Sequence, residues 1–180
     1  MKSYFIEEFL DSSDYENFIH YMITHSTYFS LVYFKYKESE KMKKSTRKIH
    51  DLLKPFKYKS FFTNMWPGTF TLNQSNAIYK VILYHSDSET IPILSSVKGL
   101  YNWNYPIYPM DLCFYRNEYC WMDSTTHEHL AHIYSDDMKE IALLKHFNDT
   151  LSFHKETENN KLFRIEDLKS KYADKPYWER

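Results

Sequence analysis

Five side chains that could do chemistry lie within one stretch of twenty residues. This stretch holds both cysteines of the chain and three of its nine histidines: Cys113, Cys120, His127, His129 and His132. Thiolate and imidazole groups are ligands that zinc favours, and a thiolate is also a strong nucleophile. The stretch is therefore where a metal site or a thiol active site can be argued from residue types.

A zinc site here would take four ligands, namely Cys113, Cys120, His127 and His132. Their spacings, C-x6-C and H-x4-H, differ from those of zinc fingers, whose first two ligands are separated by about two to four residues. His127 begins a run like the H-E-x-x-H motif, but Ala131 stands where the second histidine belongs. His129 and His132 share one face of a predicted helix and offer half a site. We therefore expect no metal and no other cofactor.

A thiol active site would combine Cys120 as nucleophile, His127 as base and Asp123 as the group that orients the base. A catalytic thiol is normally activated by a helix N-terminus or a nearby cation. Cys120 instead lies between Tyr119 and Trp121 in a predicted strand, which favours a small buried side chain. In the predicted hairpin Tyr115 faces Cys120 and Cys113 faces Met122. The two cysteines are then diagonal neighbours about 7–8 Å apart, which disfavours a disulfide.

The segment from Tyr101 to Pro109 is the strongest candidate for a contact surface. It carries four large aromatic residues in nine positions and two prolines, in what the sequence predicts to be a loop. Loops run over protein surfaces, and exposed tyrosine and tryptophan are frequent anchors of protein interfaces. The alternative is a loop folded back over the core. We select Trp103, Tyr105 and Tyr108 as partner-binding candidates.

Residues 35–59 form a basic stretch, with ten lysines and arginines against three acids. Aromatic residues among these cations could stack on bases, so a nucleic-acid binder is one alternative. The excess of lysine over arginine disfavours specific base reading, and a solvated helix face is the simpler interpretation. We expect Lys43, Lys44 and Lys48 to steer an acidic protein partner towards the chain.

Composition excludes several classes of protein. The chain has 180 residues, 43% of them apolar and 19% aromatic, which suits one domain with a substantial core. The two glycines, Gly68 and Gly99, cannot form a phosphate-binding loop or a dinucleotide fingerprint. The net charge of −1 gives no general signal for nucleic acid or for an anionic membrane. The sequence shows no secretory signal and no apolar run of about 18 residues, so we expect a cytoplasmic protein.

Periodicity and turn signals predict a single α+β domain over residues 1–165, followed by a charged C-terminal tail, residues 166–180. The domain should hold three to five packed helices and a mixed or antiparallel sheet of hairpins. Helices are predicted at about 13–25, 45–53, 88–100, 125–133 and 137–144. A strand buried on both faces is predicted at 28–34, and hairpins at 68–72 with 78–84, 112–116 with 119–122, and 151–154 with 162–165.

Two segments, Tyr28–Tyr36 and Met110–Trp121, give the chain a resemblance to a group of small proteins from Bacillus-type bacteria. That group is often labelled stage III sporulation protein AH. The resemblance implies an origin in a low-GC Gram-positive bacterium or in a phage that infects one, and it assigns no chemistry to any residue.

These observations lead to one expected function and two alternatives. We expect a non-enzymatic protein that binds and occludes another protein, of the immunity, antitoxin-like or phage anti-defence type. The alternatives are an enzyme that uses Cys120 and His127, and a nucleic-acid binder that uses the 35–59 stretch.

Overall fold

A computed structural model describes residues 1–34, 42–72, 79–158, 161–169 and 176–179 of the chain. Its main element is an eight-stranded sheet in which every described neighbouring pair is antiparallel. In sheet order the strands are β10 (Ser152–Glu156), β1 (Lys2–Phe5), β9 (Leu130–Tyr134), β8 (Tyr119–Thr125), β7 (Met110–Arg116), β2 (Tyr28–Phe34), β6 (Tyr79–His85) and β3 (Lys57–Thr63). The predicted α+β class is confirmed.

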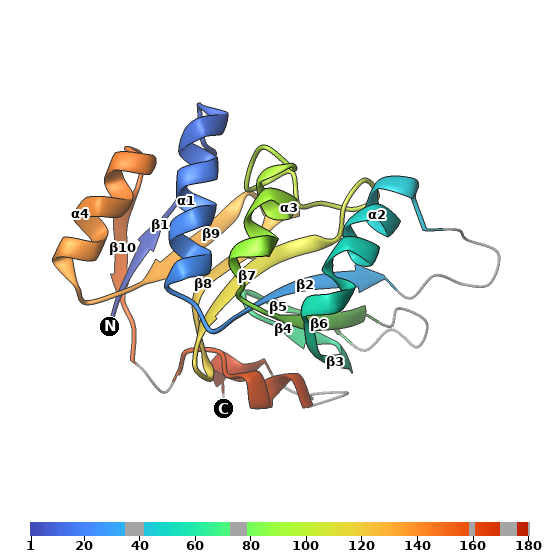
Figure 1. Ribbon diagram of the computed structural model, residues 1–180. Helices are drawn as coiled ribbons and strands as arrows, with labels where there is room; N and C mark the ends of the chain where they lie inside the picture. Colours follow the sequence, from blue (N-terminus) through green and yellow to red (C-terminus); the bar gives the residue numbers. More distant parts are fainter. Residues whose placement is uncertain (35–41, 73–78, 159–160, 170–175, 180) are drawn as a thin grey trace.

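Four α-helices lie over one face of this sheet, and smaller elements cover the other (Figure 1). The helices are α1 (Ser12–Thr24), α2 (Lys44–Leu53), α3 (Ile91–Ser95) and α4 (Met138–Phe147). Short 3-10 helices are η1 (Lys54–Phe56), η2 (Ser88–Thr90), η3 (Thr126–Glu128), η5 (Ile165–Lys169) and η6 (Tyr177–Glu179). The opposite face carries η5, η6 and a small hairpin of β4 (Met65–Trp66) and β5 (Thr69–Phe70).

The sheet therefore separates two hydrophobic cores. The larger one joins the helices to the sheet through side chains such as Phe18, Ile19 and Phe114. The smaller one joins the opposite face to the C-terminal elements, through Trp66, Phe163 and a set of strand residues. Burial from both sides explains why the run at 28–34 is apolar at nearly every position, as predicted for this strand.

Three predicted elements are wrong: one predicted helix is a strand, and the strands of two predicted hairpins pair with other strands. Residues 130–134 form β9 instead of a helix, since Ala131 and Ile133 alternate with more exposed neighbours at the two-residue period of a strand. The residue before them, His129, has a φ of 54° and ends η3. The two outer hairpins also fail: β6 pairs with β2 and β3, and β10 pairs with β1. The turn expected at 73–76 lies outside the described residues.

The described parts of the C-terminal segment pack against the sheet, which differs from the expected tail. Leu168 is fully buried, and the ring of Tyr177 packs edge-on against Phe163 at 4.9 Å between centroids. The backbone N–H of Ile165 donates to the carbonyl of Glu118 at 2.9 Å. A few apolar residues among many charges are enough to attach this segment to the smaller core.

Candidate functional site

The aromatic loop after α3 sends one ring inward and leaves others outside. Trp103 is fully buried, and its indole N–H donates to the hydroxyl of Tyr15 at 2.7 Å. Tyr105 is 41% exposed and Ile107 59% exposed, whereas Tyr108 is half-buried beside Trp103. The expectation that Trp103 forms part of a contact surface is therefore wrong, because the core supplies both space for its ring and a partner for its N–H.

Helix α2 is hydrogen-bonded to this loop. The hydroxyl of Thr46 donates to the carbonyl of Ile107 at 3.0 Å, and the hydroxyl of Ser45 donates to the same carbonyl. The first turn of α2 and the exposed loop residues therefore lie side by side. We call this surface the loop–α2 corner, and define it by its two apolar residues and four exposed cations: Tyr105, Ile107, Lys43, Lys44, Arg47 and Lys48.

The cations of the loop–α2 corner are not explained by the stability of the helix. Lys43 is the N-cap of α2 and offers no side-chain acceptor, whereas Asp11 caps α1 and Asp137 caps α4. Cations near a helix N-terminus oppose the helix dipole. Among the described residues of α2, the ion pair found is between His50 and Asp51, at 3.3 Å. The charges of the corner thus face solvent at some cost to the fold.

Next to the corner lies a cavity of about 520 Å³, which we call the aromatic cavity. It opens where β2 ends and where β6 and β7 begin, above the β4–β5 hairpin. Six aromatic side chains line it: Phe34, Trp66, Phe70, Tyr79, Tyr105 and Trp178. The imidazole of His127 and the carboxylate of Glu128 also line it, and are 3.6 Å apart.

A buried carboxylate, Asp111, forms part of the aromatic cavity. Its oxygens accept from the indole N–H of Trp66 at 2.8 Å, and from the backbone N–H and hydroxyl of Thr126 at 2.8 and 2.9 Å. Burial raises the pKa of Asp111, although these hydrogen bonds act in the opposite direction. The residue also has a φ of 54°, a backbone conformation that few non-glycine residues adopt.

A second cavity, of about 430 Å³, holds part of the cysteine–histidine stretch. The carboxylate of Asp123 lies 3.1 Å from Nδ1 of His132 and accepts from the hydroxyl of Tyr134 at 2.7 Å. Cys120 lines the same cavity. Asp123 thus orients an imidazole, as in a catalytic dyad, but the imidazole is that of His132 instead of the expected His127.

Cys120 does not supply the nucleophile that such a dyad would need. Its thiol is 1% exposed and donates to the carbonyl of Met122 at 3.1 Å. Burial raises the pKa of Cys120 well above the ordinary value, so the neutral thiol is the stable form. His127, the proposed base, is 54% exposed at the aromatic cavity. The proposed triad of Cys120, His127 and Asp123 is therefore not assembled.

The prediction that both cysteines are small buried side chains is confirmed, since Cys113 and Cys120 are 0% and 1% exposed and both are free thiols. The predicted pairing of Tyr115 with Cys120 is also observed. A bulge then places Met122 opposite Phe114 instead of Cys113. In the described part of the chain, no three or more His, Cys, Asp or Glu side chains gather as a metal site, so the candidate ligands Cys113, Cys120, His127 and His132 are not brought together.

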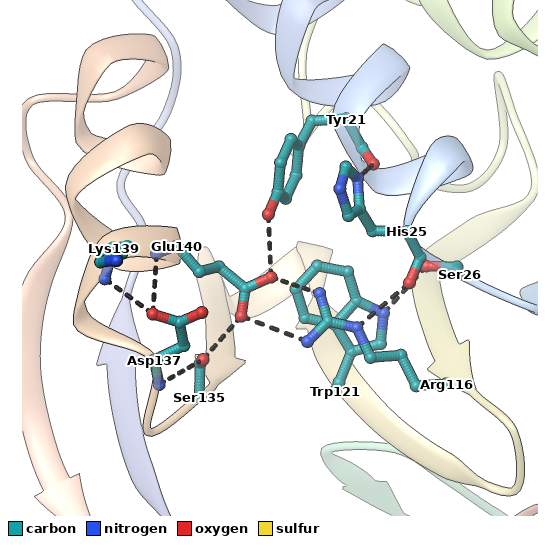
Figure 2. A network of polar contacts seen from close by, with 9 residues as sticks. All are labelled: Tyr21, His25, Ser26, Arg116, Trp121, Ser135, Asp137, Lys139 and Glu140. Carbon is teal, nitrogen blue, oxygen red and sulfur yellow. Dashed lines mark hydrogen bonds and ion pairs between the residues drawn. The ribbon is translucent and has the colours of Figure 1, made fainter.

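A polar network beneath the helices holds α4 to the rest of the fold (Figure 2). The carboxylate of Glu140 forms an ion pair with the guanidinium of Arg116, and accepts from the hydroxyls of Tyr21 at 2.9 Å and Ser135 at 2.6 Å. The guanidinium also lies 3.5 Å from the ring centroid of Trp121. These contacts join α4 to α1 through Tyr21 and to β7 through Arg116, which is a structural role.

Sequence reasoning did not identify the aromatic cavity. Its residues come from β2, β4, β5, β6, the start of β7, η3, η6 and the aromatic loop, and no local motif joins them. One signal was available: Trp66-Pro67-Gly68 is an aromatic turn, and Gly68 has a φ of 73° with Oγ1 of Thr125 only 2.6 Å from where a Cβ would lie. Glycine is needed there so that the hairpin can approach β8.

Comparison of the chain with protein-family models, with curated proteins and with solved structures found no match. The resemblance to the sporulation-labelled proteins stays a hypothesis. Within the described ranges, no helix combines the length and apolar character needed to cross a membrane.

Proposed function

We propose that the chain is a non-enzymatic protein that binds and occludes an acidic protein partner through the loop–α2 corner. One observation carries the proposal: the hydrogen bond from Thr46 to the carbonyl of Ile107 places exposed apolar side chains beside a group of cations. An immunity, antitoxin-like or anti-defence role is the type of function that such occlusion would serve.

The chemistry of the corner suits protein recognition. Tyr105 and Ile107 can bury apolar area at the centre of an interface, where a few residues dominate the binding energy. Lys43, Lys44 and Lys48 surround them with charge, which raises the association rate with an acidic surface more than it raises the final affinity. The burial of Trp103 below the loop fixes the backbone that carries Tyr105, so less conformational freedom is lost on binding.

The experiment is capture of the partner with tagged variants of the full chain. Wild type should recover one protein in stoichiometric amount from the source cells, and Tyr105→Ala with Ile107→Ala should lose it. Lys44→Glu with Lys48→Glu should weaken capture strongly at low salt and less at high salt. Phe153→Ala on β10 and Lys145→Glu on α4 serve as matched controls, because Figure 1 shows these two elements at the opposite end of the molecule from α2. Equal capture by the corner variants and the controls would contradict the proposal.

The two alternative functions predict different results. A nucleic-acid binder would shift DNA or RNA in gels, and its affinity would fall steeply with salt. A thiol enzyme would need a reactive Cys120, which the raised pKa of that thiol opposes. We also propose a cytoplasmic location, which two free and buried thiols support.

A further inference from the structure

Six of the fourteen described residues that line the aromatic cavity are Phe, Tyr or Trp. The ring of Phe34 lies 4.8 Å from that of Tyr79 and 4.5 Å from that of Tyr105, at angles of 51° and 57°. Trp66 and Tyr79 are likewise 4.8 Å apart and tilted by 51°. Rings at such angles form walls instead of a stack, so several of them can contact one occupant.

The charged side chains that line the aromatic cavity have one predominant sign. Among its described lining residues the carboxyl groups are Asp111 and Glu128, the one basic side chain is His127, and there is no lysine or arginine. The hydrogen-bond donors to Asp111, from Trp66 and Thr126, are neutral. None of these direct hydrogen bonds comes from a cation, and His127 favours the ionised form of Asp111 only through its electrostatic field. A buried charge without a cation in contact is costly.

We propose that the aromatic cavity binds a small organic cation that carries an alkylated ammonium group. The faces of aromatic rings attract such a group, and the carboxylates of Asp111 and Glu128 add a matching charge. The volume of about 520 Å³ lies within the range of small-molecule sites. This site goes beyond the proposed protein-binding function and does not depend on it.

Other classes of ligand fit the cavity less well. A small anion would meet two carboxyl groups, with His127 as the one described basic side chain in the lining. A divalent metal ion requires several oxygen ligands, and the described residues hold no group of three or more His, Cys, Asp or Glu side chains that could bind one. A neutral apolar molecule would fill the space but would bring no positive charge to the carboxyl groups of Asp111 and Glu128.

The test compares choline with the neutral alcohol in which a carbon atom replaces the nitrogen of choline. The two molecules have the same shape and differ in charge. Titration calorimetry on the full chain should show saturable binding of choline at millimolar concentrations, and at least about tenfold weaker binding of the neutral alcohol. Tryptophan fluorescence should change with the same dissociation constant, since Trp66 and Trp178 line the cavity.

Two variants locate the site. Phe70→Leu removes one ring of the wall and should weaken choline binding by at least about fivefold, and Glu128→Gln removes one exposed charge and should weaken it by about twofold to threefold. Phe153→Leu, an exposed ring on β10, should leave binding unchanged. Circular dichroism establishes that each variant is folded. Absence of choline binding, equal binding of the neutral alcohol, or an unchanged affinity in Phe70→Leu would each overturn the proposal.

Discussion

Lys43 offers a direct test of whether the cations of the loop–α2 corner serve binding or stability. It occupies the N-cap of α2 without accepting a hydrogen bond, although its ψ of 146° is extended like the 137° of Asp11, which does cap α1. An acidic or amide side chain at this position could accept from the N–H groups of Ser45 or Thr46. The perturbation is the series Lys43→Gln, Lys43→Asn and Lys43→Asp.

Each member of the series adds one physical effect. Glutamine removes the cation from the helix N-terminus, which should stabilise the fold by about 0.5 kcal/mol. Asparagine also caps the helix, for a total of about 1.5 kcal/mol. Aspartate adds a favourable negative charge, for a total of about 2 kcal/mol. For a chain of this size, the melting temperature of Lys43→Asp should therefore rise by about 4–8 °C.

The assay is thermal and urea unfolding followed by circular dichroism, with partner capture measured on the same proteins. Stability should increase in the order Lys, Gln, Asn, Asp. Capture at low salt should be equal for the neutral Gln and Asn variants, weaker in both than in wild type, and weakest for Asp. Lys145→Gln, in the last turn of α4, is the control, because it removes a cation that favours its helix and should lower stability slightly. A fall in stability along the Lys43 series would refute the view that Lys43 is retained at a cost to the fold.

Three further predictions concern the interior. Glu140→Gln should cost about 2–3 kcal/mol in urea unfolding, since it breaks the pair with the partly exposed Arg116 but can keep the bonds from neighbouring hydroxyls. Burial alone would raise the pKa of Glu140, but hydrogen bonds from Arg116 and Ser135 outweigh this effect and lower it. The resulting stability should be present above the ordinary pKa of 4.5 and be lost as the pH falls through the lowered pKa, and Glu140→Gln should lack this loss. Finally, a thiol-directed reagent should label Cys113 and Cys120 in denaturant and leave both unlabelled in the native protein, because both are buried. Rapid labelling of Cys120 in the native protein would instead support the alternative function, a thiol enzyme.

The elements that could be predicted from the sequence are those with strong local patterns. The apolar stripe of Tyr15, Phe18, Ile19, Met22 and Ile23 predicts α1, and all five residues are buried in it. The nearly unbroken apolar run of β2 and the turn at 117–118 between β7 and β8 are also local signals. Each of these signals identifies one helix, strand or turn without information on the element that packs against it.

The elements that were missed depend on distant partners. The lysine-rich segment Lys57–Thr63 becomes a strand because it pairs with β6, and the exposed lysines of this edge strand disfavour pairing with another chain. Residues 2–5 become β1 because they fill the place between β9 and β10. Pairing between segments that are far apart in the sequence leaves no periodic pattern of apolar residues in β1 or β3, so it cannot be assigned from local sequence.

In the candidate site, too, local pattern alone does not determine which residues are buried. The aromatic loop shows the physical reason. Trp103 and Tyr105 have the same local setting, but Trp103 lies above the hydroxyl of Tyr15 on α1, which gives its N–H a partner inside the core. Tyr105 follows two residues later, beside α2, where Thr46 holds the carbonyl of Ile107. The error about Trp103 therefore supports the proposal for Tyr105, because a loop anchored by one buried ring presents the next in a fixed position. Preorganised contacts of this kind lose little entropy on binding, which is the property that an occluding protein requires.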